Sequence, residues 1–211
     1  EMQRSLVGSE MCIRDRRSGI HRTAMEIDYL LPITTRQELR TWLEQNHRSS
    51  SCCWVLTTRK PSPHAIPYLD AVEEALCFGW IDSTRKKTAS GFLAQRLTPR
   101  SRKSKWSELN KERVRRLTRL GLMTPHGEKC LPEMDPEAFR IDPDILEALQ
   151  KDPRVYSNFL AFPRLYRHVR LDTIQIKKNQ PELFHSRLEK FLKNTRENRM
   201  FGEWHDGGRP V

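Results

Sequence analysis

Residues 75–82 read Ala-Leu-Cys-Phe-Gly-Trp-Ile-Asp, and this stretch decides the fold. Upstream of it, Pro67 suits the first turn of a helix, and apolar side chains follow at helical spacing as far as Leu76. Gly79 stands where a helix takes a left-handed C-terminal cap, and Trp80 opens a run with the composition of a strand. The stretch therefore predicts a helix that ends at Gly79 and leads directly into a strand.

Two further segments, 52–58 and 91–98, are rich in strand-forming residues and are bounded by Pro, Gly and Ser. Together with the strand after Gly79 they predict a small antiparallel sheet of about three strands. Ahead of them, Thr35 is a suitable N-cap for a helix over 37–46.

The rest of the chain has helical periodicity. A helix is expected over 104–120, with Ser104 as its N-cap and Gly121 as its stop. Further helices are expected over roughly 144–150, 155–169 and 181–195. The predicted fold class is α+β, a mainly helical single domain with a small antiparallel sheet of about three strands.

Composition limits the class of protein. The 211 residues are 36% hydrophobic, which is enough for one globular unit, and no run reaches the 18 or so apolar residues of a membrane helix. The five cysteines are odd in number and show no metal-ligand spacing, so reduced thiols, no metal and no cofactor are expected. The expected location is the cytoplasm.

The first residues do not read as part of the fold. Residues 5–16 resemble the translation of a sequencing adapter, and residues 17–24 resemble translated upstream DNA. We therefore expect residues 1–24 to be a non-native or disordered leader and a single domain, with its C-terminal helices, to span residues 25–211.

Positive charge is concentrated in one segment. Between Arg85 and Arg119 there are thirteen Lys or Arg residues and two acids, an excess equal to the formal net charge of +11 for the whole chain. Such a segment can neutralise nucleic-acid phosphates, although basic helices are often simply solvated. The candidates for nucleic-acid contact are Lys103, Lys105, Arg113, Arg115, Arg116 and Arg119.

A candidate ligand site combines one acid with arginine, tryptophan and asparagine: Asp82, Arg96, Arg100, Trp106 and Asn110. If these side chains converge near the start of the helix at 104–120, the arginines can hold a phosphate or carboxylate bidentately while Trp106 stacks on a ring. A structural ion pair and a core tryptophan are the alternative.

Three nearby residues are accessory candidates: Glu74, Cys77 and Trp80. Cys77 lies at the end of a helix among carboxylates, and both features favour a neutral thiol. We expect Cys77 to be a structural, partly buried small apolar residue.

Three phrases occur in fixed order: the stretch at 75–82, Gln95-Arg-Leu-Thr-Pro-Arg100 and Ser104-Lys-Trp-Ser-Glu-Leu-Asn110. Together with Gly121-Leu-Met123, they resemble the YdeI/OmpD-associated family, also called bacteriocin-protection proteins. The resemblance implies a small bacterial protein linked to survival of cationic antimicrobial peptides, and it implies no particular reaction or ligand.

The leading hypothesis is thus a cytoplasmic stress or envelope-protection factor that binds an anionic ligand or a protein partner through a basic pocket, without membrane insertion. One alternative is a nonspecific nucleic-acid-binding protein. Another is an enzyme acting on a phosphorylated small molecule, with Asp82 as base and the arginines as clamps for the oxyanion. The sequence favours a non-enzymatic role, identifies no catalytic residues and leaves the ligand and the oligomeric state open.

Overall fold

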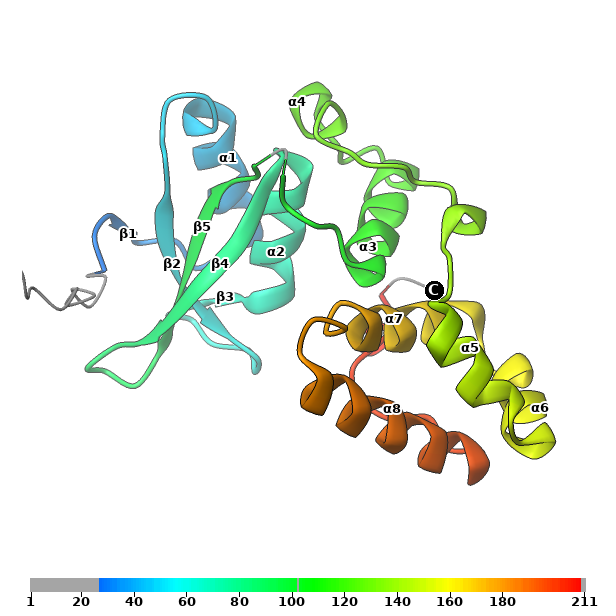
Figure 1. Cartoon of the computed structure of the whole chain (residues 1–211). Coiled ribbons are helices and arrows are strands. Elements are labelled where there is room, and N and C mark those ends of the chain that lie inside the picture. The colour runs from blue at the N-terminus through cyan, green and yellow to red at the C-terminus, as the bar shows by residue number, and fades with distance from the viewer. Residues whose placement is uncertain (1–26, 102, 210–211) are drawn as a thin grey trace, which may run out of the picture.

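The structure, a computed structural model, describes residues 27–101 and 103–209. It has a sheet half and a helical half, which lie side by side (Figure 1). The sheet half contains β1 (Leu30–Leu31), α1 (Arg36–Asn46), β2 (Cys53–Thr58), β3 (Ile66–Pro67), α2 (Tyr68–Cys77), β4 (Trp80–Lys87), β5 (Leu93–Pro99), α3 (Glu108–Arg119) and α4 (Pro125–Glu128). The helical half contains η1 (Pro136–Ala138), α5 (Pro143–Gln150), α6 (Pro153–Ala161), α7 (Arg164–Gln175), α8 (Pro181–Arg196) and η2 (Asp206–Gly208).

The α+β fold class is confirmed, with eight α-helices and one small sheet among the described residues. The strand order is β1-β2-β5-β4, and the three long strands pair antiparallel. The sheet is nevertheless mixed, because β1 and β3 each add two residues parallel to β2. Strands this short are not visible as a sequence pattern, which is why they were not expected.

The helix–Gly–strand stretch forms as its sequence indicates. Gly79 has a φ of +69°, and its amide donates to the Leu76 carbonyl, so the chain reverses there from α2 into β4. An added Cβ on Gly79 would lie 2.8 Å from Cys130 Sγ. Only glycine therefore fits both the backbone conformation and the space at this turn.

Each half has its own hydrophobic core. The first core lies between the sheet and the helices α1, α2 and α3, and its largest member is Trp80, which is fully buried. The second lies among α5 to α8 and includes Tyr166 and Phe191. The helices at 37–46 and 181–195 and the reversal at Gly121 also form close to their expected positions.

Two helix boundaries differ from the prediction. Helix α3 begins later than expected, because Ser107 rather than Ser104 caps it and accepts from the Asn110 amide. The single helix expected over 155–169 is two helices, α6 and α7. Pro163 has no amide to donate, and Phe162 before it has an extended ψ of 150°, so the helix ends there and a new one begins.

The C-terminal segment returns from α8 to the sheet half. Arg113 on α3 makes two hydrogen bonds to Asp206, of 2.6 and 2.8 Å, and Arg209 reaches Asp70 on α2 at 2.8 Å. The expectation for residues 1–24 lies outside the described residues, and none of the helices described could cross a membrane.

Candidate anion-binding groove

A basic groove lies where β5 leads toward α3 and where α4 packs beside it. Its volume is about 780 Å³, and Trp106 forms part of its wall. The cationic or titratable side chains that line it are Arg100, Lys105, Lys111, His126 and Lys129. No Asp or Glu is among the described residues that line this groove, which favours an anionic occupant.

Arg100 is the central side chain of the groove. It is only 8% exposed, and its guanidinium lies over the Trp106 ring, 3.7 Å from the ring centroid. Its backbone amide donates to the Gly79 carbonyl, which fixes it at the end of β5, and its Nη1 donates to the Lys105 carbonyl at 3.2 Å. Two other nitrogens of the guanidinium, Nε and Nη2, are buried and have no hydrogen-bond partner among the described residues.

Burial lowers the pKa of Arg100, and the Asp82 carboxylate partly opposes this shift. Buried N–H groups of a charged side chain are costly when they lack an acceptor. A phosphate, sulfate or carboxylate oxygen would satisfy them, since the guanidinium fork matches such oxyanions.

The other cations of the groove differ in their ion pairing and their exposure. Lys111 is paired with Glu108 at 2.7 Å, whereas Lys105 and Lys129 are exposed. Burial and the positive charges of His47, Arg48 and Lys129 lower the pKa of His126. His126 is therefore neutral at pH 7 and gains a charge only in acid.

The five predicted ligand residues do not form one cluster. Arg100 and Trp106 meet in the groove, but Asp82 accepts a hydrogen bond of 2.7 Å from the Tyr68 hydroxyl. Arg96 on β5 is the register partner of Trp54 on β2. Asp82 on β4 is the register partner of Leu97, the residue that follows Arg96 on β5. Because neighbouring residues of a strand point to opposite faces, Arg96 and Asp82 lie on opposite faces of the sheet.

The Asn110 side chain is hydrogen-bonded within α3. Its Oδ1 accepts a hydrogen bond of 2.6 Å from Arg113 Nη1, and Arg113 in turn binds Asp206. Asn110 thus helps to hold the C-terminal segment in place, and it does not line the groove.

The three accessory candidates are buried and make contacts inside the protein. Glu74 is 1% exposed and is paired with Arg36 at 2.5 Å and Arg40 at 3.0 Å. The Trp80 indole donates to the His47 carbonyl at 3.2 Å. Cys77 is fully buried, and burial together with the Glu74 charge raises its pKa to about 12. The burial of Cys77 and its raised pKa agree with a structural role.

The basic helix α3 is mostly neutralised within the protein. Arg113 is paired with Asp206 at 2.6 Å, and Arg116 with Glu73 on α2 at 3.0 Å. Arg115 is paired with Glu112 and also donates twice to the Met134 carbonyl. Of the six cations expected to contact nucleic acid, these three are engaged internally, and the exposed ones are Lys103, Lys105 and Arg119.

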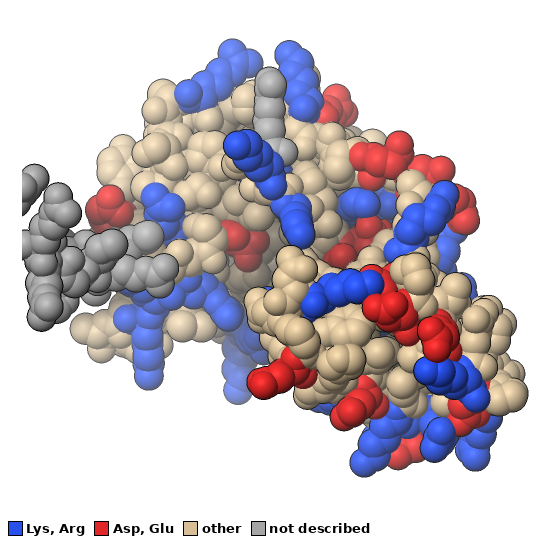
Figure 2. All heavy atoms as spheres, viewed as in Figure 1, with Lys and Arg blue, Asp and Glu red and all other residues tan. Residues whose placement is uncertain are grey.

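Figure 2 shows the resulting surface, where red acidic and blue basic side chains intermix over the helical half. The charge excess of the sequence is therefore not a continuous basic face in this view.

The groove residues that sequence reasoning missed come from the α4 region. His126 and Lys129 join the groove because α4 packs against the end of α2, where Thr124 Oγ1 donates to the Cys77 carbonyl at 2.7 Å. Gly127 permits this approach, since an added Cβ would lie 2.2 Å from that carbonyl oxygen. The Thr-Pro start of α4 is a local capping signal, but it does not indicate where the helix packs.

The fold and groove define a small α+β protein with a buried arginine at an electropositive groove. Comparison with family models gives two matches: a domain of unknown function (DUF8412) over residues 31–130, and the family described as bacteriocin-protection, YdeI or OmpD-associated over residues 138–198. The second match agrees with the family that the sequence resembles, over the part of the chain that it covers.

The match to that family lies in the helical half, whereas the phrases that carried the resemblance lie at 75–123, within the first match. No curated protein and no solved structure matches the chain.

Proposed function

We propose that the protein binds a small ligand carrying a phosphate, sulfate or carboxylate group in the basic groove. The observation that carries this proposal is the environment of Arg100. Its buried Nε and Nη2 have no hydrogen-bond partner among the described residues. It lies at a groove that is lined by cations and, in the same part of the chain, by no acid. The ligand oxyanion would pair with the guanidinium fork, and a ring would stack against the Trp106 side of the groove.

We further propose that this binding serves protection against cationic antimicrobial peptides or bacteriocins, from the cytoplasm. The family description supports the biological role, since it names bacteriocin protection for the family. A cationic peptide would not itself occupy a groove lined by cations. In this proposal the protein therefore acts through an anionic ligand and does not sequester the peptide.

The binding test is a thermal-shift screen with sulfate, phosphate, nucleotides and sugar phosphates. A ligand that binds only the native state raises the melting temperature, and Arg100→Ala should abolish that rise. Arg100→Lys keeps the charge but loses the fork, so it should retain only part of the rise. Arg119→Ala is the matched control, because Arg119 is an exposed arginine on α3 that does not line the groove.

The cellular test measures survival of cationic peptide by cells that express each variant. The proposal expects Arg100→Ala to lose protection and Arg119→Ala to keep it. Equal protection by folded Arg100→Ala and by the parent would refute the link between groove and phenotype, even if binding in vitro is confirmed.

A further inference from the structure

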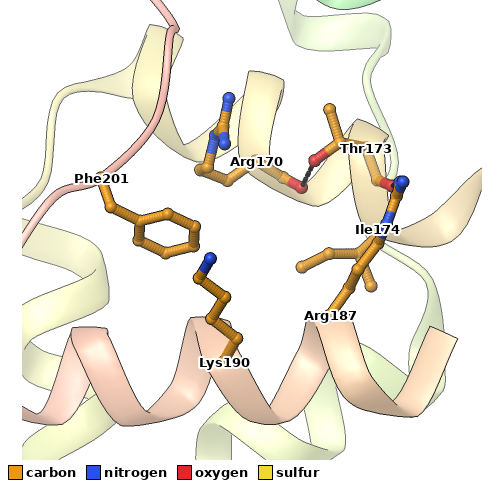
Figure 3. Close-up of a pocket in the computed structure, with 6 residues that line it drawn as sticks. All are labelled: Arg170, Thr173, Ile174, Arg187, Lys190 and Phe201. Carbon is orange, nitrogen blue, oxygen red and sulfur yellow. Dashed lines mark hydrogen bonds between the residues drawn. The ribbon is translucent and has the colours of Figure 1, made fainter. Parts of the chain in front are cut away.

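A second pocket lies in the helical half, between α7, α8 and the segment that follows α8. Its volume is about 300 Å³, and it is lined by Arg170, Thr173, Ile174, Arg187, Lys190 and Phe201 (Figure 3). In Figure 3, Arg187 and Lys190 extend from α8, Arg170 and Ile174 lie across from them on α7, and the Phe201 ring faces Lys190. Three cations therefore surround one small hollow.

These three cations have no carboxylate partner in the part of the chain that the structure describes. Arg170, Arg187 and Lys190 make no ion pair within 4.0 Å, unlike the arginines of α3. Arg170 Nη2 and Arg187 Nη1 instead donate to the backbone carbonyls of Glu203 and Thr173. These bonds orient the guanidinium groups and leave their charges without a counter-ion.

Two further observations indicate that the buried guanidinium of Arg170 is energetically unfavourable as it stands. Its Nε is buried and has no hydrogen-bond partner within residues 27–101 and 103–209. Burial lowers the pKa of Arg170, and the charge of Arg187 lowers it further, while the nearby Tyr166 and Glu203 oppose the shift. An anion between the two helices would relieve the repulsion among the cations.

The pocket also has an apolar side. The Phe201 ring centroid lies 5.2 Å from Lys190 Nζ and 5.6 Å from the Arg170 guanidinium carbon. Gly202 allows the segment to approach this closely: its φ is +73°, and an added Cβ would lie 2.5 Å from Arg170 Nη1. Ile174 is almost fully buried beside the hollow. A ligand with both an anionic group and a hydrophobic ring matches this combination.

We propose that this pocket is a binding site for a phosphate monoester, distinct from the groove at Arg100. The phosphate, with a charge of −1.5 to −2 near neutral pH, would lie between Arg187 and Lys190, and the organic part would pack against Phe201 and Ile174. The site links α7, α8 and the returning C-terminal segment, so an occupied pocket stabilises the docking of that segment.

The test uses the full chain and three probes: inorganic phosphate, phenyl phosphate, and vesicles containing a phosphatidic acid. Lys190→Met is the main variant, because Lys190 is exposed and its side chain makes no hydrogen bond to any residue that the structure describes, so the fold should survive. Arg187→Lys keeps the charge but removes the fork. Lys193→Met is the control, since Lys193 is an exposed lysine on the same helix that does not line the pocket.

Phenyl phosphate should bind more tightly than inorganic phosphate, and Lys190→Met should weaken that binding by roughly 10- to 100-fold, as expected for one lost charged contact. Lys193→Met should leave it unchanged. In an Arg100→Ala background, where the groove no longer contributes, Lys190→Met should still weaken the remaining binding, which separates this site from the groove. Vesicle binding that Lys190→Met abolishes would assign the phosphate to a lipid headgroup. The proposal is wrong if no probe binds in the millimolar range, or if binding is equal in Lys190→Met and Lys193→Met.

Discussion

Replacing Asp206 with Asn removes the carboxylate that anchors the C-terminal segment to α3. The Arg113 and Asp206 side chains are only 10% and 5% exposed, and they form two hydrogen bonds of 2.6 and 2.8 Å. Burial opposes the charge of Arg113, but the bonds to Asp206 outweigh it and raise the pKa of Arg113. The substitution would therefore leave a buried guanidinium with no carboxylate.

Removing one partner of a buried ion pair costs roughly 3–5 kcal/mol. Because Asn110 still accepts one hydrogen bond from Arg113, we expect a value near the lower end, about 3 kcal/mol. For a protein of this size the melting temperature falls by about 2–4 °C per kcal/mol, so Asp206→Asn should lower it by roughly 6–12 °C.

Differential scanning calorimetry measures this change. Glu147→Gln is the control, because it removes an exposed pair with Lys151 in which the side chains are 70% and 71% exposed. Such pairs contribute less than about 1 kcal/mol. The double variant Arg113→Met with Asp206→Asn should recover part of the loss, since no buried charge remains. If Asp206→Asn melts as close to the parent as Glu147→Gln does, the anchoring role of the pair is refuted.

Three further predictions concern the sheet half. Burial raises the pKa values of Cys53 and Cys77 from 9.0 to about 12, so both thiols should resist alkylation in the native protein, as peptide mapping would show. Because only the unfolded thiols ionise near pH 9, the free energy of unfolding should fall as the pH rises from 9 toward 12. Gly127→Ala should lower the free energy of unfolding by about 1–3 kcal/mol in urea titration, because its Cβ meets a backbone carbonyl. Sulfate affinity at the groove should rise as pH falls below 6.5, where His126 with its lowered pKa becomes charged, and calorimetric titration of His126→Gln should show no such rise.

The sequence predicted those parts of the fold that local signals determine. Thr35 forms the expected capping interaction, and Gly79 and Gly121 have the left-handed conformation that ends α2 and α3. The two-residue strands β1 and β3 were missed because two residues carry no periodicity. The break at Pro163 was missed because the apolar spacing continues across it, although the proline itself was a sufficient signal.

The candidate site was only partly predictable, for a different reason. Arg100 and Trp106 are close in sequence and meet in the groove, but the partners of the other basic residues are remote. Glu73 reaches Arg116 across 43 residues, and Asp206 reaches Arg113 across 93. Sequence reasoning counted these arginines as a basic surface, because the acids that neutralise them lie outside the basic segment. Packing, rather than composition, decides which charges remain available.

The central claim is that an oxyanion occupies the groove at Arg100, and crystallography with selenate tests it most directly. Selenate has the shape and charge of sulfate, and selenium can be located by its anomalous scattering. The account predicts a selenium peak in the groove with oxygens in hydrogen-bonding distance of the Arg100 guanidinium, and no such peak in Arg100→Ala crystals. Selenium peaks found only elsewhere, with the Arg100 Nε and Nη2 still unpaired, would contradict it.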